Sequence, residues 1–512
     1  MRFVWSWLVA SNGLDRRVRF CATRFVDRSV AMSSPGAVSS DAGEVRFLTT
    51  RSVLDGLIRV IVGSLTLLTF VSPSSVLAQY TEAKIGEYLN YAVAATNGSV
   101  YAGYNSIGYA GPVVYTSALG WTGLPISTGF NTSLPYYGYT TGISRDGTVI
   151  SGYAWGTTTT GSSIQYALYW VNGVETVIPA PPDDPSANLM TARAVSGDAT
   201  TLVVEDTTGT SATKVETYLY DIATQNFTAL GFLGSTVQQT YGTALNYDGS
   251  VMIGYSNLDN TKTHGFIWTK TSGLKDIGVP YHKTYYVEPT CISDDGTVIF
   301  GRHTELNGWL GFRYTTSTGF EDIGGLSPTG CTADGKEAFG IQDLYFPGIW
   351  TTTVGGGFLD DLLKAHGIKS ALGDLLAPVT ISPDGTLLTA TGVFAYVGDQ
   401  VWDGTYQIGI PSPLSTTPIP GRKVIFSTAY QTTLKVPAPG LVGYSDFSKG
   451  ATAAVVSRPR HAATFVLNAN GGFTYTPKAG FGGHNDYFTY HLINSFGTSV
   501  NGTVTIGVGA AP

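Results

Sequence analysis

One short phrase, Ser-x-Asp-Gly-Thr-Val-Ile-x-Gly, returns along the chain and constrains the fold more than any other feature. The second residues of its seven turns lie 39 to 52 residues apart, at positions 98, 147, 199, 249, 296, 335 and 385. The copies at 98 and 199 are degraded, and those at 335 and 385 are shorter. A steady step of this size is the signature of a repeat architecture.

Each copy predicts a strand, a tight turn and a strand. Asp-Gly and Asn-Gly accept the positive φ of tight turns, and the flanking residues alternate between β-branched or small and polar ones. The turn residues are Asp146, Gly147, Asp248, Gly249, Asp295, Gly296, Asp334, Gly335, Asp384 and Gly385. These aspartates invite a calcium or acid–base interpretation. Because all the repeats share them, we expect each to close its turn by bonding its own backbone.

A second pair of strands follows within each unit. It is rich in aromatic residues at 167–178, 264–278 and 311–324. About seven units of four strands predict a β-propeller over 79–410. Within it, 357–367 has apolar residues at helical spacing and predicts one short amphipathic helix that ends at Gly367.

The phrase, its aromatic strand and the following Gly-Leu-x-Asp-Ile-Gly resemble the HAF-type extracellular repeat of bacteria. The resemblance covers most of 90–400, and the short helix before the last copy belongs to it as well. It implies a secreted or surface propeller without a shared set of catalytic residues.

Residues 1–78 are expected to form a leader that is absent from the mature fold. A basic flank, the apolar run 60–71 and the small-residue exit 76–78 describe a secretory signal peptide at about 51–78. The run is short for a membrane span, so an uncleaved anchor is the weaker alternative. The expected location is secreted or at the cell surface, with membrane contact only through the signal peptide.

Composition and charge exclude several classes of function. Without 1–78, which hold 9 of the 29 Lys and Arg and 5 of the 36 Asp and Glu, 20 basic residues stand against 31 acidic ones, a net charge of −11, and the absence of a basic cluster there argues against nucleic acid as a partner. The seven histidines show no metal spacing and no nucleophile partner, and no phosphate loop is present. The sequence therefore predicts no metal site and no cofactor.

Two cysteines, Cys291 and Cys331, remain after the leader is removed, each just before the turn of its repeat. They lie in successive units, and an exported location permits a disulfide between them. The sequence leaves this pairing open and favours two buried free thiols, since their Cα separation cannot be deduced from spacing.

The stretch 411–422 is rich in Pro, Ser and Thr and predicts a semi-rigid linker. Beyond it, 423–508 alternates aromatic residues with Thr between Asn-Gly and Pro-Gly turns, which predicts a β-sandwich. We expect few contacts across the linker and a sandwich that folds alone. Its expected core is Phe465, Phe473, Tyr475, Phe488, Tyr490, Val504 and Ile506.

This second module closely resembles a bacterial Ig-like, cadherin-like domain, including its Lys-Val-Pro-Ala-Pro-Gly-Leu opening at 435–441. Members often carry an Asn-Asp pair soon after that Pro-Gly, whereas this chain has 444–446 as Tyr-Ser-Asp. Calcium therefore remains conceivable for this module but unsupported.

Two classes of function follow. The favoured one is a non-enzymatic protein whose propeller binds a glycan or a cell-surface protein, with the Ig-like module as spacer or adhesive unit. The alternative is a propeller enzyme that hydrolyses or cleaves polysaccharide through carboxylates at the central channel, and fold alone cannot choose between them. Five tryptophans could stack on sugars, but most of those at strand positions are expected to pack between blades instead: Trp155, Trp170, Trp268, Trp309 and Trp350. The candidate ligand contacts are loop tyrosines: Tyr136, Tyr137, Tyr281, Tyr285 and Tyr286.

Overall fold

The fold is described from a computed structural model. It describes residues 80–511, apart from gaps at 87–88, 95–99, 106–110, 127–137, 158–162, 209–213, 235, 281–285, 306–307, 343–345, 369–374 and 394–401. The predicted leader, signal peptide and cleavage site lie outside this part. Among the described residues, no helix combines the length and the apolar character that a bilayer crossing requires.

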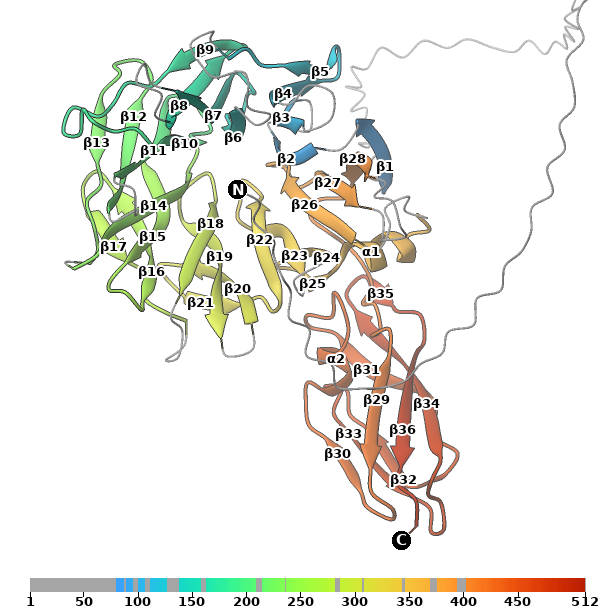
Figure 1. The fold of residues 1–512 in the computed structure, drawn as a ribbon. Coiled ribbons are helices and arrows are strands. Elements are labelled where there is room, and N and C mark those ends of the chain that lie inside the picture. Colours follow the sequence, from blue (N-terminus) through green and yellow to red (C-terminus); the bar gives the residue numbers. More distant parts are fainter. Residues whose placement is uncertain are drawn as a thin grey trace, which may run out of the picture. The chain divides into compact units, whose positions relative to one another are not determined.

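The repeats form seven four-stranded antiparallel units, which we call blades 1 to 7 (Figure 1). Blade 1 holds β2 (Leu89–Ala94), β3 (Val100–Asn105), β4 (Gly111–Thr116) and β5 (Gly120–Gly123). Blade 2 holds β6 (Gly138–Ile143), β7 (Val149–Thr157), β8 (Ser163–Val171) and β9 (Val174–Val177). Blade 3 holds β10 (Met190–Val195), β11 (Thr201–Thr208), β12 (Lys214–Asp221) and β13 (Phe227–Ala229). Blade 4 holds β14 (Gln238–Leu245), β15 (Val251–Asn257), β16 (Thr263–Thr269) and β17 (Gly273–Asp276).

The remaining blades continue in the same order. Blade 5 holds β18 (Val287–Ile292), β19 (Val298–Glu305), β20 (Gly308–Thr315) and β21 (Gly319–Asp322). Blade 6 holds β22 (Leu326–Cys331), β23 (Glu337–Gln342), β24 (Phe346–Thr351) and β25 (Gly355–Phe358). Blade 7 holds β26 (Leu375–Ile381), β27 (Leu387–Val393), β28 (Trp402–Gly409) and, from the start of the described chain, β1 (Thr81–Gly86).

The first strands of successive blades, β2 to β26, lie side by side around a central channel, and β26 also contacts β2 (Figure 1). The ring is therefore closed, as the repeat count predicts. Its closure uses β1, which pairs antiparallel with β28 from Thr81–Gly409 to Gly86–Thr405. Blades 3 and 4 also share a short parallel pairing between β12 and β14, so their strands form one eight-stranded sheet.

Large aromatic side chains fill the spaces between blades. Trp170, Trp268 and Trp350 are all at most 6% exposed, which confirms the expected packing for these three, whereas Trp155 and Trp309 are partly exposed. The helix α1 (Leu359–Ala365) also forms as predicted, with Leu359, Leu362 and Leu363 buried.

The C-terminal module is a two-sheet sandwich. One sheet has β29 (Val424–Thr428), β36 (Gly502–Val508), β34 (Asn485–Asn494) and β31 (Thr452–Ser457) in that order, with β35 (Gly497–Thr498) beside β34. The other has β30 (Leu434–Val436), β33 (Phe473–Pro477) and β32 (Ala462–Leu467), and the short α2 (Gly440–Gly443) follows β30. All seven residues of the expected core are at most 5% exposed and belong to one apolar cluster, so that prediction is confirmed.

The expectation that few contacts cross the linker is wrong. Phe447 of the sandwich is fully buried in the apolar cluster of blades 6 and 7 and α1. Its backbone N–H donates to the Gly356 carbonyl at 2.9 Å, and the Lys449 N–H donates to Val354 at 3.0 Å. At Gly357 a Cβ atom would lie 2.6 Å from the Phe447 ring, so this close approach requires glycine.

The stretch 411–422 is itself packed rather than extended as a free tether. Leu414 is buried in the propeller core, and its backbone N–H donates to the Glu337 carboxylate at 2.7 Å. Ile419 exchanges two backbone hydrogen bonds of 2.9 Å with Asp446. The proline-rich composition of this stretch carries no information about the surface on which it lies.

Candidate ligand-binding site

The Asp-Gly turns share one hydrogen-bond pattern. In blade 5, Asp295 accepts from the Ser293 hydroxyl at 2.6 Å and from the Thr297 backbone N–H at 3.0 Å. The same bonds recur around Asp146, Asp198, Asp334 and Asp384, with Thr332 in place of Ser in blade 6. They hold the pKa of Asp295 below its ordinary value. These carboxylates are engaged in closing their own turns, and no group of residues suited to a metal ion occurs in the described part of the chain.

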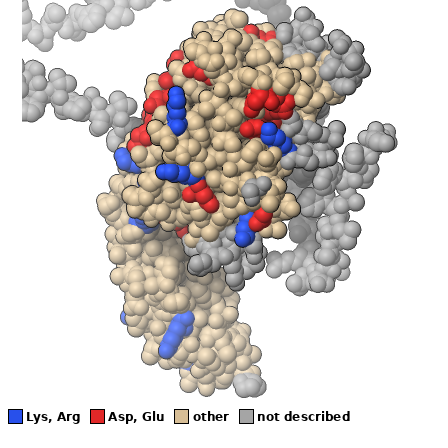
Figure 2. Space-filling view, turned by 90° about the vertical axis from the view of Figure 1, so that its left-hand side faces the viewer, with Lys and Arg blue, Asp and Glu red and all other residues tan. Residues whose placement is uncertain are grey.

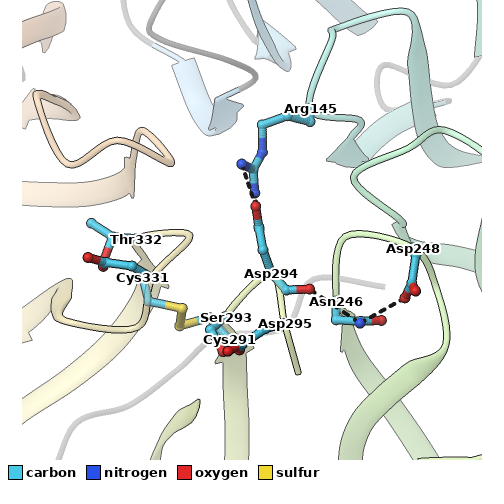
Figure 3. A network of polar contacts seen from close by, with 10 residues as sticks. Arg145, Asn246, Asp248, Cys291, Ser293, Asp294, Asp295, Cys331 and Thr332 are labelled. Atoms are coloured by element: carbon cyan, nitrogen blue, oxygen red, sulfur yellow. Dashed lines mark hydrogen bonds and ion pairs between the residues drawn. A yellow bond between two sulfur atoms is a disulfide. The ribbon is translucent and has the colours of Figure 1, made fainter. Parts of the chain in front are cut away.

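These turns surround one end of the channel, where charged side chains meet across it. Arg145 of blade 2 donates to Asp294 of blade 5 at 2.9 Å through one of its two N–H···O contacts (Figure 3). The guanidinium also lies 5.7 Å from the centre of the Tyr247 ring. The cavity that remains at this end has a volume of about 190 Å³. We call this end the turn end of the channel.

Cys291 and Cys331 line the same cavity and are joined in a disulfide (Figure 3). The bond links the inner strands of blades 5 and 6, whose Cα atoms lie 6.1 Å apart at this point. The preference for two free thiols is therefore wrong, because the inner strands of successive blades lie side by side and bring the two cysteines within bridging distance, although Cys331 stands one residue nearer to its turn than Cys291 does.

The opposite end of the channel is lined by aromatic side chains. Every inner strand runs toward its Asp-Gly turn, so residues near the start of these strands and their partners on the second strands lie at this end. Tyr139 stacks on Tyr153 with ring centres 5.1 Å apart, and Tyr241 stacks on Tyr255 at 4.8 Å. Tyr286 follows at 5.5 Å from Tyr255.

Trp309 completes this aromatic series, edge-on to Tyr286 at 5.3 Å. We call the six residues Tyr139, Tyr153, Tyr241, Tyr255, Tyr286 and Trp309, with the charged groups described next, the aromatic mouth. All six rings are partly exposed, so each offers part of its surface to solvent.

Two arginine–glutamate pairs lie among these rings. Arg193 Nε donates to Glu205 at 2.6 Å, and Arg302 Nε donates to Glu288 at 2.8 Å. In each pair the carboxylate is the more buried partner: the side chains of Glu205 and Glu288 are 4% and 15% exposed, against 48% for Arg193 and 36% for Arg302. Burial raises the pKa of Glu205 above its ordinary value, and Arg193 opposes that shift.

Part of the aromatic mouth encloses a cavity of about 300 Å³. Its lining residues are Arg193, Glu205, Tyr241, Gly242, Thr243, Tyr255, Glu288 and Thr290. Arg302 adds a cation–π contact, since its guanidinium carbon lies 4.4 Å from the centre of the Trp309 ring.

A bulge in each inner strand explains how Arg193 reaches this cavity. The register slips by one residue in all seven inner strands, and the extra residue is Thr in blades 2, 4, 5 and 6. In blade 4 the hydroxyl of that residue, Thr243, donates to the Pro289 carbonyl of the next blade at 2.8 Å. Blade 3 has Arg193 in this position, and Glu205 where blades 1, 2 and 4 have tyrosine.

Sequence reasoning chose Tyr286 as a ligand contact, considered Trp309 as a residue that could stack on sugars, and missed the other members of this site. Tyr286 lies in the aromatic mouth, whereas Tyr136, Tyr137, Tyr281 and Tyr285 fall outside the described residues. Arg193 and Glu205 were overlooked, although a signal existed: they flank the degraded copy of the phrase near 199, where the repeat departs from its own pattern.

A separate acidic cluster lies beside blade 3. Asp206 is 2% exposed, and burial together with the neighbouring Asp184 raises its pKa to about 7 from an ordinary value of 3.8. The folded protein thus keeps this proton at pH values where the unfolded chain has released it. Stability is therefore fully present below pH 4 and declines as the pH rises through 7.

Asp206→Asn is expected to stabilise the propeller above pH 7, because an amide cannot acquire the buried negative charge. The rise in Tm over the wild type should be larger at pH 8 than at pH 4.5, where the aspartate is already mostly protonated. Thermal unfolding followed by circular dichroism at both pH values measures it. An equal change in Tm at the two pH values would contradict the assignment.

Comparison with known proteins identifies the C-terminal module. Residues 416–507 match the family described as the bacterial Ig domain. The match begins inside the stretch predicted as a linker, in agreement with the pairing of Ile419 and Asp446. Bacterial Ig domains are typical of secreted and surface proteins. A search of curated proteins gives no match.

Some solved structures show partial likeness to this chain. TolB from Acinetobacter baumannii aligns with 14% identity and a TM-score of 0.33 over 46% of this chain and 53% of its own. Prolyl oligopeptidase B from Galerina marginata aligns with 10% identity and a TM-score of 0.37 over 67% of this chain and 48% of its own. The chain thus spans about half the length of either protein, and scores this low carry no argument about activity. The HAF-type resemblance stays a prediction; the strand pairing and the family match describe a seven-bladed β-propeller followed by a bacterial Ig domain.

Proposed function

We propose that this protein is an exported bacterial glycan-binding protein, without enzymatic activity, that holds its ligand at the aromatic mouth of the propeller. The observation that carries the proposal is a cavity of about 300 Å³ lined by the partly exposed Tyr241 and Tyr255 together with the Arg193–Glu205 pair and Glu288. Ligand sites typically combine such apolar walls with a few fixed polar groups.

The two ends of the channel favour different roles. At the turn end, the Arg145 guanidinium and the Asp294 carboxylate are already paired with each other across the channel. At the aromatic mouth, the more exposed arginines present N–H groups beside the rings. On the face drawn in Figure 2, acidic and basic side chains lie among a largely uncharged surface. A surface of this kind is compatible with a location outside the cell. The bacterial Ig domain supports export and would serve as the spacer.

The proposal is tested with a glycan array probed with the purified chain from residue 79. Tyr255→Ala and Trp309→Ala should each weaken binding about two- to tenfold, because each removes an aromatic contact of the kind worth about 0.5–1.5 kcal/mol. Tyr487→Ala is the matched control, since Tyr487 is 52% exposed on the Ig domain. The proposal is refuted if the wild type binds no glycan. It is also refuted if Tyr487→Ala loses binding while Tyr255→Ala and Trp309→Ala keep it.

An enzyme that cleaves polysaccharide is the second candidate. It is favoured by one observation: Glu205 and Glu288 line the same cavity, as a pair of catalytic carboxylates would. Against it, each carboxylate already pairs with an arginine. Incubating the bound glycan with the protein and analysing reducing ends decides between them: products that appear with wild type and vanish with Glu288→Gln would establish the enzyme.

A further inference from the structure

We infer that the aromatic mouth selects uncharged saccharides, and that the pairs Arg193–Glu205 and Arg302–Glu288 determine this selectivity. The inference rests on the proposed function and names the ligand class of that site. It follows from the balance of charge, the donors left on the arginines and the shape of the aromatic wall.

Charge is balanced in the mouth. Its described ionisable groups are two arginines and two glutamates, and each arginine has a carboxylate within 2.8 Å. Because the carboxylates are the buried partners, their negative charge is poorly screened by water. An acidic sugar would find no unpaired cation among these groups, since each arginine is already neutralised by its glutamate, and its carboxylate would add an uncompensated negative charge to a partly desolvated site.

The same pairs suit hydroxyl groups. A guanidinium has five N–H donors, and the contact of Arg193 with Glu205 uses Nε. Its remaining donors can bind sugar oxygens, while the less buried carboxylate of Glu288 can accept from a hydroxyl. Hydrogen bonds to charged groups are the stronger ones, so a neutral polyol gains from both signs of charge.

The repeat itself shows that Arg193 and Glu205 are additions to the scaffold. Four of the other blades have Thr at the bulge and three have tyrosine at the Glu205 position, and those blades form the same strands. The fold therefore does not require an ion pair in blade 3. An exposed guanidinium beside a buried carboxylate at the channel wall is better explained by contact with a ligand.

The inference is tested by titrating the chain from residue 79 with uncharged oligosaccharides (cello-, malto-, galacto- and manno-oligosaccharides) and with oligogalacturonates of the same length. Intrinsic fluorescence and calorimetry report binding. We expect an uncharged series to bind at least about tenfold more tightly than the acidic one.

Two variants test the role of the pairs. Glu205→Gln leaves Arg193 without its counter-charge, so the ratio of acidic to uncharged affinity should rise about tenfold; Glu288→Gln should do the same and serves if Glu205→Gln fails to fold. Asp294→Asn is the matched control: it removes one carboxylate at the turn end and should leave the ratio unchanged. Arg193→Thr, which restores the residue of the other blades, should weaken the uncharged series at least about tenfold.

The outcomes separate the two proposals. If the wild type prefers oligogalacturonates, or if Asp294→Asn shifts the ratio as much as Glu205→Gln and Glu288→Gln do, the charge-balance inference is wrong while glycan binding stands. If neither series nor any glycan on the array binds, the proposed function fails with it.

Discussion

Replacing Phe447 by alanine is expected to cost about 3–5 kcal/mol and to separate the unfolding of the Ig domain from that of the propeller. Phe447 is fully buried among side chains of blades 6 and 7 and α1, although it belongs to the C-terminal module. Its removal leaves a cavity at the junction of the two modules. Differential scanning calorimetry of the chain from residue 79 should show one coupled transition in the wild type and two in the variant.

Phe488→Ala is the matched control for this prediction. Phe488 is equally buried, but its neighbours all lie within the sandwich. This variant should lower the stability of the Ig domain by a similar amount without creating a cavity in the propeller core. If Phe447→Ala leaves the wild-type transition unchanged, or if the wild type already unfolds in two independent steps, the junction does not couple the modules.

Removing the disulfide by the double change Cys291→Ser and Cys331→Ser is expected to cost about 3–4 kcal/mol. The bond closes a segment with a sequence separation of 40 residues, and in the chain-entropy account a loop of that length contributes about this much. Urea unfolding of the oxidised wild type and the double variant measures the difference. A reductant should destabilise the wild type toward the variant and leave the variant unaffected; an unaffected wild type would contradict the prediction.

The repeat phrase predicted the propeller well because its signals are local. An Asp-Gly turn with alternating flanks needs no distant partner, and seven such turns at even spacing leave few architectures open. The sandwich core followed in the same way from alternation, as the burial of Phe473 and Tyr475 shows. The helix α1 was recognisable from three leucines at helical spacing.

Features that depend on distant partners could not be predicted. The strand Thr81–Gly86 carries no copy of the phrase, so its place in blade 7 rests on pairing with a segment at the other end of the propeller. Phe447 sits in the sandwich sequence and gives no sign that its side chain is buried in another module. Arg193 was partly predictable. The degraded copy of the phrase marks blade 3 as unusual, but the direction of the Arg193 side chain depends on the bulge between Ala192 and Ala194.

The pairing of β1 with β28 also sets an order of events during synthesis and export. The strand that completes the last blade is made first, and its partner, 402–409, emerges only after all the other blades. Until then the ring stays open and β1 exposes unpaired backbone groups. Its pairing with β28 joins residues that lie far apart in the sequence, and such contacts form late. If a signal peptide precedes β1, as the sequence predicts, the propeller ring cannot close until nearly its whole length has been synthesised. Until then the chain would stay in an incompletely folded state that can still be translocated across a membrane.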